Sequence, residues 1–266
     1  MARLSGKAGA VYVGSQVVED CEDAWVTGGA GRVSTLDNTD YKVGSGSVKV
    51  VTTAIGVTTL LHYEDFGAID LTSYTTIMLW VKSSINQAAG DCQLLLDDTA
   101  GCGTPLETLN FPALVADTWK YVKLTLANPA ALGAVVSVGI KQIVDLADMS
   151  FWVDDIRAAK AVAGIKSWTL DQVVDVLECT GFDSGGNRQF VPVLKGWSGS
   201  FEGYKEGAPL AIGTVTGLEL QESATATQQY RGSAIISGPH PKTDIGGLVT
   251  YAYDFKGVHA LEIATA

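Results

Sequence analysis

Short apolar segments rich in β-branched residues, each soon followed by a turn signal, most constrain the fold of this 266-residue chain. They recur roughly every ten residues, and several alternate apolar with polar positions, as half-buried strands do. Clear examples are residues 47–53, 76–82, 93–97, 119–126, 135–140 and 150–156. The pattern predicts a mainly β fold of the sandwich type.

Helical signals are weak by comparison. No segment has the apolar spacing of a three-turn helix, and the one helical candidate is a short turn over residues 207–213, where Pro209 suits a first-turn position. The 30 glycines favour tight turns instead. With 47% hydrophobic and 18% charged residues, the chain can bury a core and does not have the composition of a disordered protein.

Charge divides the chain unevenly. Residues 15–161 hold 18 acidic and 9 basic residues, a net charge of −9. The remainder holds 11 acidic and 9 basic residues, which gives −2 of the total of −11. Segments of small residues, 14–16 and 158–164, mark both edges of the acidic stretch. These features predict a separate acidic unit over residues 15–161 and a second β region that begins with a strand over 165–171.

Several classes of protein are disfavoured. The chain is acidic overall and lacks the excess of Lys and Arg with which proteins bind the phosphates of nucleic acid. No apolar run reaches the ~18 residues of a membrane helix, so we expect no membrane insertion. Residues 1–7 lack the apolar region of a secretory signal, which predicts folding in a cytoplasm. The absence of CxxC and HxxxH clusters argues against a zinc site.

The four cysteines are scattered without paired spacing. In a reducing compartment they are most simply free thiols. A disulfide between Cys92 and Cys102 across a loop is the alternative. The cysteines are Cys21, Cys92, Cys102 and Cys179.

The sequence also lacks a catalytic constellation. His62, His240 and His259 are isolated, and no Gly-x-Ser-x-Gly motif stands at a strand-to-helix turn. The adjacent carboxylates at 97–98 and 154–155 point to opposite faces of a strand and do not form a pair by themselves. We therefore expect a protein that is not an enzyme and has no catalytic residues.

The two ends of the chain resemble one family. Residues 1–14 look like the opening of a tailed-bacteriophage tail tube (major tail) protein, and the segment from Val162 onward looks like its continuation. The strings that carry this resemblance are residues 163–170, 182–192, 196–204 and 228–257. It implies a tail-tube β-sandwich or barrel domain built from residues 1–14 and 162–266. It further implies hexameric rings that stack into a tube, through which genomic DNA passes without specific binding.

The middle of the chain is similar to a second family, the galactose-binding-like jelly rolls that serve as carbohydrate-binding modules. The residues that carry this similarity are 18–20 with Trp25, 40–50, 69–74 and 151–156. It implies a jelly-roll domain over residues 15–161, inserted into the first hairpin of the tube domain and projecting from the outer wall, where host-surface glycans are possible partners.

This second resemblance also implies a structural calcium ion. Its ligands would be Glu19, Asp154 and backbone carbonyls of the loop 37–46, with Asp20 or Asp155 as alternatives to the two carboxylates. Beyond this ion we expect no cofactor. Aromatic residues in this region are core residues or, alternatively, a platform on which sugars stack, and the carbohydrate-binding residues stay unassigned. The aromatic residues concerned are Trp25, Tyr41, Trp80, Trp119 and Trp152.

Together, the resemblances predict a structural virion protein of the phage tail, assembled in the host cytoplasm. Its partners would be copies of itself, other tail proteins and the passing DNA. Two alternatives remain open. One is a non-catalytic carbohydrate-binding or adhesion protein. The other is a different virion protein, such as a tail terminator or a capsid decoration protein.

Overall fold

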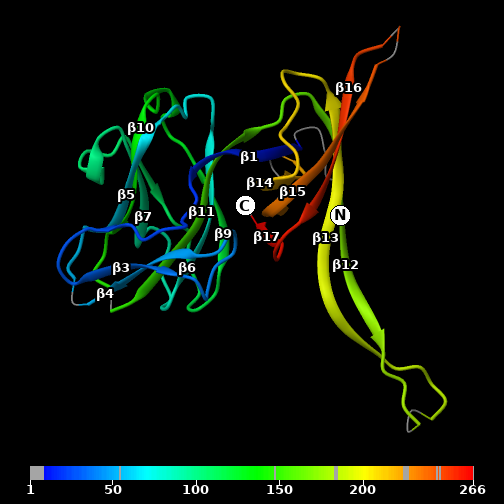
Figure 1. Cartoon of the computed structure of the whole chain (residues 1–266), viewed down its shortest axis with the longest axis horizontal. Helices are drawn as coiled ribbons and strands as arrows, with labels where there is room; N and C mark the ends of the chain where they lie inside the picture. Colours follow the sequence, from blue (N-terminus) through cyan, green and yellow to red (C-terminus); the bar gives the residue numbers. More distant parts are fainter. Residues whose placement is uncertain are drawn as a thin grey trace. The chain divides into compact units, whose positions relative to one another are not determined.

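The computed structural model describes residues 9–53, 55–146, 148–182, 185–223, 228–243, 245 and 247–265. It confirms the predicted mainly β fold (Figure 1). The chain divides into two compact units. Unit 1 comprises Met1–Val11 and Val162–Ala266, and unit 2 comprises Tyr12–Ala161. The identification of these units as a tail-tube domain and an inserted jelly roll stays a prediction, because compactness does not identify a family.

Unit 2 is a β-sandwich of two antiparallel sheets. One sheet contains β3 (Arg32–Asp37), β4 (Ser47–Thr52), β6 (Thr76–Ser83), β9 (Lys120–Thr125) and β11 (Ser150–Ala161), together with β1 (Ala10–Glu19). The other has the order β2 (Val26–Thr27), β5 (Thr59–Ile69), β10 (Val135–Gln142), β7 (Cys92–Asp97) and β8 (Glu107–Asn110). Two short 3-10 helices, η2 (Ala100–Cys102) and η3 (Pro129–Ala131), lie in its loops.

Strand β11 organises the first sheet. It pairs along most of its length with β6 on one side. On the other side its first half pairs with β4 and its second half with β1. The strand predicted at the closing end of this domain is therefore central to it, and it joins segments that lie far apart in the sequence.

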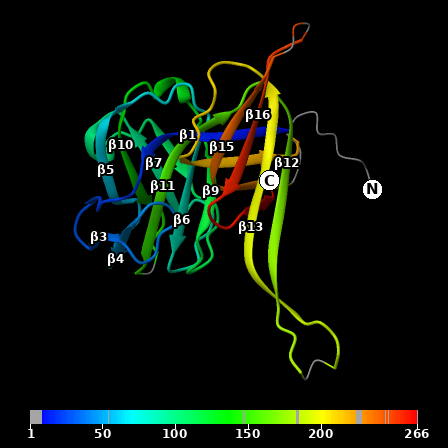
Figure 2. The same ribbon diagram turned by 45° about the vertical axis from the view of Figure 1, so that its right-hand side comes forward.

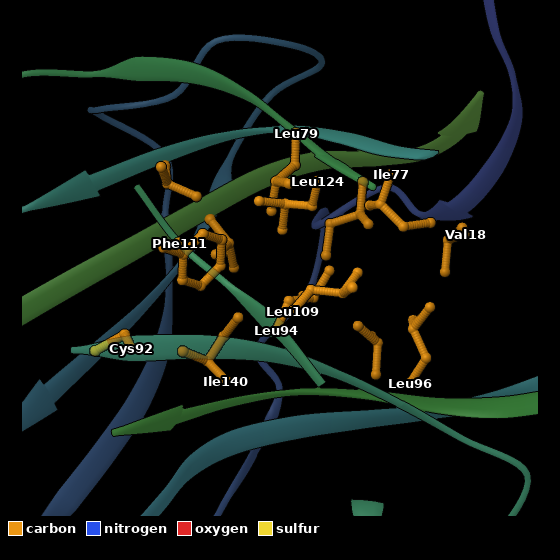
Figure 3. Close-up of a cluster of buried hydrophobic side chains, with 14 of the residues drawn as sticks. Val18, Ile77, Leu79, Cys92, Leu94, Leu96, Leu109, Phe111, Leu124 and Ile140 are labelled. Atoms are coloured by element: carbon orange, nitrogen blue, oxygen red, sulfur yellow. The ribbon is translucent and has the colours of Figure 1, made fainter. Parts of the chain in front are cut away.

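Alternation along the strands builds the core between the two sheets. In β6, Ile77, Leu79 and Val81 point inward to a common hydrophobic cluster, while the residues between them lie on the outer face. The second sheet meets this cluster with side chains such as Leu94 and Ile140 (Figure 3). The period of two thus decides which side chains of a strand enter this core. The outer face of β6 is buried too, because Met78 and Trp80 belong to a second cluster with Tyr121 and Ala159.

Unit 1 is a single antiparallel sheet with the order β12 (Ile165–Glu178), β13 (Phe190–Tyr204), β16 (Thr250–Gly257), β15 (Gln228–Lys242) and β14 (Val215–Gln221). β17 (Glu262–Thr265) also pairs with β15. Stacked rings hold its centre: the Phe201 and Tyr253 centroids are 5.2 Å apart. In Figures 1 and 2, the hairpin β12–β13 continues far past the other strands of this unit.

The structure bears on the expectations for the 207–213 turn, the cysteines and membrane helices. The helical turn expected over residues 207–213 is wrong, because Gly207 and Gly213 have φ angles of 78° and 79°, which a right-handed helix excludes. All four cysteines are free thiols, so Cys92 and Cys102 form no disulfide. In the part of the chain that the structure describes, no helix has the length and apolar character of a membrane span.

Candidate functional sites

The distal half of the hairpin β12–β13 is an apolar ribbon, here called the arm (residues 173–178 and 190–194). β16 covers β13 only over Ser198–Tyr204, so within the described residues the arm strands pair only with each other. Eight apolar side chains of the arm are exposed. They are Val173, Val174, Val176, Leu177, Phe190, Val191, Val193 and Leu194, with relative exposures of 41–71%.

Apolar residues occupy both faces of the arm. Leu177 lies opposite Val191, while on the other face Val176 lies opposite Pro192 and Glu178 opposite Phe190. A solvated ribbon would carry polar residues on at least one face. The composition of the arm is therefore that of a strand pair buried on both sides, although nothing in unit 1 covers it within the described residues.

A pocket lies at the base of the arm, here called the arm-base pocket. Its volume is about 540 Å³, and it lies wholly within unit 1. Trp197 forms one wall, with its indole N–H donating to the His259 carbonyl at 2.7 Å. The lining combines apolar groups with Gln172 and Lys195; further members are Val258, His259, Ala260 and Leu261.

The outer face of the first sheet of unit 2 carries a second constellation. Trp152 lies between Lys49 of β4 and Lys82 of β6 in the strand register. The two ammonium groups lie 4.7 and 4.5 Å from its ring centroid. Cation–π attraction of this kind stabilises both partners, so Trp152 is held between two charges.

Two aspartates bind the indole N–H groups and the lysine ammonium groups on this face. Asp37 accepts the Trp152 indole N–H at 3.0 Å and lies 3.9 Å from the Lys49 ammonium. Asp40 accepts the Trp119 indole N–H at 2.6 Å and pairs with Lys82. Burial raises the pKa of Asp37, but hydrogen bonds from Thr39 and Trp152 outweigh it and bring the pKa to about 2. Asp37 is therefore ionised throughout the neutral range.

Of the five aromatic residues expected to be core residues or, alternatively, a sugar-stacking platform, three are buried. Trp25, Trp80 and Trp152 are only 2%, 3% and 7% exposed, and Trp25 belongs to the core between the sheets. Tyr41, which is 40% exposed, and the half-buried Trp119 remain accessible. Strand alternation alone could not separate these cases, because it does not say which outer-face aromatics a loop covers.

The carboxylates predicted to bind calcium lie near one buried thiol. Besides burial, which is the main cause, the charges of Asp154, Glu19 and Asp155 raise the pKa of Cys21. The Asp154 Oδ2 accepts the N–H groups of Lys42 and Val43 at 2.6 and 2.9 Å. Its Oδ1 is buried without a hydrogen-bond partner. Burial raises the pKa of Asp154 to about 8 and that of Glu19 to about 7.

These contacts fit a calcium ion in part. The unpaired Oδ1 of Asp154 is an oxygen that a cation would satisfy. However, the described loop contacts to Asp154 come from N–H groups, not from carbonyl oxygens. Among the described residues, no group of three or more acidic, His or Cys side chains could hold a metal ion. The alternative Asp155 is already paired with Arg157 at 2.6 Å. A site at Glu19 and Asp154 would need backbone oxygens and water for the remaining ligands, and it stays a prediction.

Calcium removal tests this prediction. If Glu19 and Asp154 bind calcium, saturating calcium will stabilise unit 2 by about 2–3 kcal/mol relative to excess EDTA, because the ion binds only the folded state. We expect a calorimetric melting temperature that rises with calcium in the wild type and not in Asp154→Asn. The exposed Asp70→Asn is the matched control and should respond like the wild type. Identical melting temperatures of the wild type in calcium and in EDTA would show that Glu19 and Asp154 bind no calcium ion.

Comparisons with known proteins add a likeness of fold. No protein-family model and no curated protein matches the chain. Among solved structures, an exo-beta-agarase is 12% identical with a TM-score of 0.38, and the match covers 56% of this chain and 25% of that one. A family 30 carbohydrate binding module is 15% identical with a TM-score of 0.36, covering 57% and 90%. A protein from Bacteroides thetaiotaomicron described as sugar binding is 11% identical with a TM-score of 0.32, covering 55% and 95%.

Two of these three structures are described as a carbohydrate binding module and a sugar binding protein. The present chain spans only a quarter of the length of the agarase. At such identities the likeness concerns the fold alone, so the function is proposed below from the geometry of the described residues.

Proposed function

We propose that this chain is a non-catalytic structural protein that assembles with copies of itself through unit 1 and carries unit 2 as an appended binding domain. The observation that supports this proposal is the arm, whose apolar side chains are exposed on both faces. A two-stranded hairpin is at best marginally stable alone in water. An exposed apolar patch of this kind is typical of an interaction surface.

A further copy of the chain is the simplest partner for the arm. β12 is the terminal strand of the unit 1 sheet, so its outer edge offers unpaired backbone groups. Closed or stacked symmetric assembly removes such edges without needing another protein. This reading matches the tail tube that the ends of the sequence resemble, with hexameric rings stacked in a phage tail, contacts to other tail proteins and assembly in the host cytoplasm.

The same reading makes the tube a passive conduit. Residues outside 15–161 carry 11 acidic and 9 basic side chains. Without a cationic excess, a tube built from them would release few counterions from DNA. The genome would therefore pass without specific binding, and no catalytic group is needed.

Charge introduced into the arm is expected to prevent assembly. In Leu194→Lys and Val176→Lys, an ammonium group replaces a side chain that assembly would bury, so we expect the association to weaken at least about tenfold. Sedimentation velocity and negative-stain microscopy of the full chain should show rings or tubes for the wild type and monomers for both variants.

The matched control is Val33→Lys, which places the same charge on an exposed valine of unit 2. This variant should assemble like the wild type. A wild-type chain that stays monomeric at all attainable concentrations would overturn the proposal.

A second candidate function is glycan binding by unit 2. It is favoured by Tyr41 and Trp119, which remain accessible beside the charged side chains of Lys82 and Asp40. An accessible ring beside charged hydrogen-bonding groups suits a sugar, which has an apolar face and a hydroxyl rim. A glycan array probed with the full chain tests this. Binding should be lost in Trp119→Ala and kept in Val115→Ala, and a blank array for the wild type would exclude this function.

A further inference from the structure

We infer that the arm-base pocket is the receptor for the distal arm of a second copy of this chain. This inference rests on the self-assembly proposed above and identifies the surface that receives the arm. Two features of unit 1 lead to it: an apolar ribbon without a covering partner, and an open pocket elsewhere on the same unit.

The arm of a chain cannot fill its own pocket. Gln172, a pocket residue, and Glu178, at the end of β12, lie on one continuous strand. At about 3.3 Å per residue, six residues of extended strand place them roughly 20 Å apart. β12 pairs with β13 on both sides of a register shift between Val174 and Val176, so the ribbon cannot fold back without losing this ladder. The occupant must therefore come from another molecule.

The pocket is chemically suited to the arm. Trp197, Val258 and Leu261 give it apolar walls, and the volume of about 540 Å³ accommodates several side chains of the kind that Phe190 and Leu194 expose. The Trp197 indole N–H is already bonded to the His259 carbonyl, so that wall needs no polar ligand.

Charge also complements across the proposed contact. Lys195 places an ammonium group among the lining residues. The exposed arm carries Asp175 and Glu178; the Glu178 Oε1 accepts the Thr180 hydroxyl at 2.8 Å, and its ion pair with the Arg188 Nε is long, at 4.0 Å. An arm entering from a second copy would bring carboxylates toward Lys195, which steers association and suppresses the wrong orientation.

Because the arm and the pocket are different surfaces, the contact is heterologous. Each copy offers an arm to one neighbour and a pocket to the other, a geometry that closes into a ring or continues as a filament. A symmetric pair in which two arms face each other would use one surface twice and would leave both pockets open.

Disulfide trapping tests this inference, because the residue that directly follows the arm strand β12, Cys179, is a native exposed thiol while the three other cysteines are buried. In Val258→Cys, a second thiol stands at the half-exposed rim of the pocket. Under mild oxidation of the full-length chain, we expect ladders of covalent oligomers on non-reducing gels, with Cys179 linked to position 258 in peptide mass spectra. Such bonds form only when the two Cβ atoms come within about 4.5 Å.

Two controls keep the experiment specific. Val33→Cys places a thiol on an exposed part of unit 2 and should give no ladder. Combining Val258→Cys with Cys179→Ser should abolish the ladder while leaving assembly intact.

The outcomes separate this inference from the proposed function. Rings or tubes by sedimentation without a 179–258 link would overturn the pocket as receptor and leave self-assembly standing. Links between two Cys179 thiols in the wild type would equally overturn it in favour of a symmetric arm contact. A chain that neither assembles nor cross-links would overturn both.

Discussion

Between pH 6.5 and pH 3, proton linkage at His62 is expected to lower the free energy of unfolding of unit 2 by roughly 4–5 kcal/mol, because His62 is fully buried and must stay neutral. Glu19 and Asp154, whose pKa values are raised by burial, change this free energy in the opposite direction. The His62 ring lies 4.7 Å from the Trp25 ring, and its Nδ1 lies 3.3 Å from the Ser34 hydroxyl. Its Nε2 has no partner. Burial lowers the pKa of His62 from 6.5 to about 3, with no compensating charge.

The sign follows from proton linkage. Below pH 6.5 the unfolded chain binds a proton at His62 while the folded protein does not, so each pH unit costs about 1.4 kcal/mol until the folded pKa near 3 is reached. Above pH 6.5 both states are neutral at this residue, and the stabilising contribution is fully present.

Urea unfolding of unit 2, measured as a function of pH, tests this expectation. In His62→Asn the slope of stability against pH between 6.5 and 3 should differ from the wild-type slope by about one proton, in the direction of less loss on acidification, even where the absolute stability falls because of the smaller side chain. The control His240→Asn removes an exposed histidine paired with Asp254 and should keep the wild-type slope. Equal slopes for the wild type and His62→Asn would show that His62 does not account for the acid sensitivity.

Gly257→Ala is expected to destabilise unit 1 strongly for so small a substitution. A Cβ at Gly257 would lie 2.1–2.4 Å from three atoms of the Trp197 ring, far inside van der Waals contact. Trp197 cannot yield easily, because Gly232 lies against its far edge and its indole N–H is held by the His259 carbonyl. We expect a loss of about 1–3 kcal/mol, the usual cost of overpacking a well-ordered core.

Gly196→Ala provides the matched comparison, because a Cβ there would meet nothing within 4 Å although Gly196 adjoins Trp197. This variant should be neutral or slightly stabilising, since it restricts the unfolded chain. Hydrogen exchange followed by mass spectrometry on peptides of β13 and β16 locates the effect. Faster exchange there in Gly196→Ala than in Gly257→Ala would contradict the packing described for Trp197.

Most strands of unit 2 could be predicted from local sequence. The expected segment 76–82 corresponds to β6, and 47–53 to β4, because short apolar or β-branched runs bounded by turn or polar breaks are a local signal. The strand expected over 165–171 is confirmed as the first part of β12, but β12 continues to Glu178 and includes the first strand of the arm. The arm was missed because a ribbon that is apolar on both faces, such as Val173 to Leu177, does not alternate.

The candidate sites were less predictable than the strands. Nothing local distinguishes Trp119, which is accessible, from Trp152, which two lysines enclose. Likewise, nothing local predicts that the Asp154 carboxylate accepts the N–H groups of Lys42 and Val43, which lie more than a hundred residues away in the sequence. These outcomes depend on which strands and loops become neighbours, and adjacent residues do not encode that.

The sequence by itself determined that the chain is mainly β and where six strands of unit 2 lie, because both follow from residue types and turn signals within a few neighbouring residues. Only the tertiary structure decided three further features. β1 pairs with β11 although most of the sequence of unit 2 lies between them, an apolar arm extends beyond its sheet, and a pocket lies at the base of this arm. Such features arise from contacts between segments far apart in the chain, where the free energy depends on the complete set of neighbours and not on any one stretch.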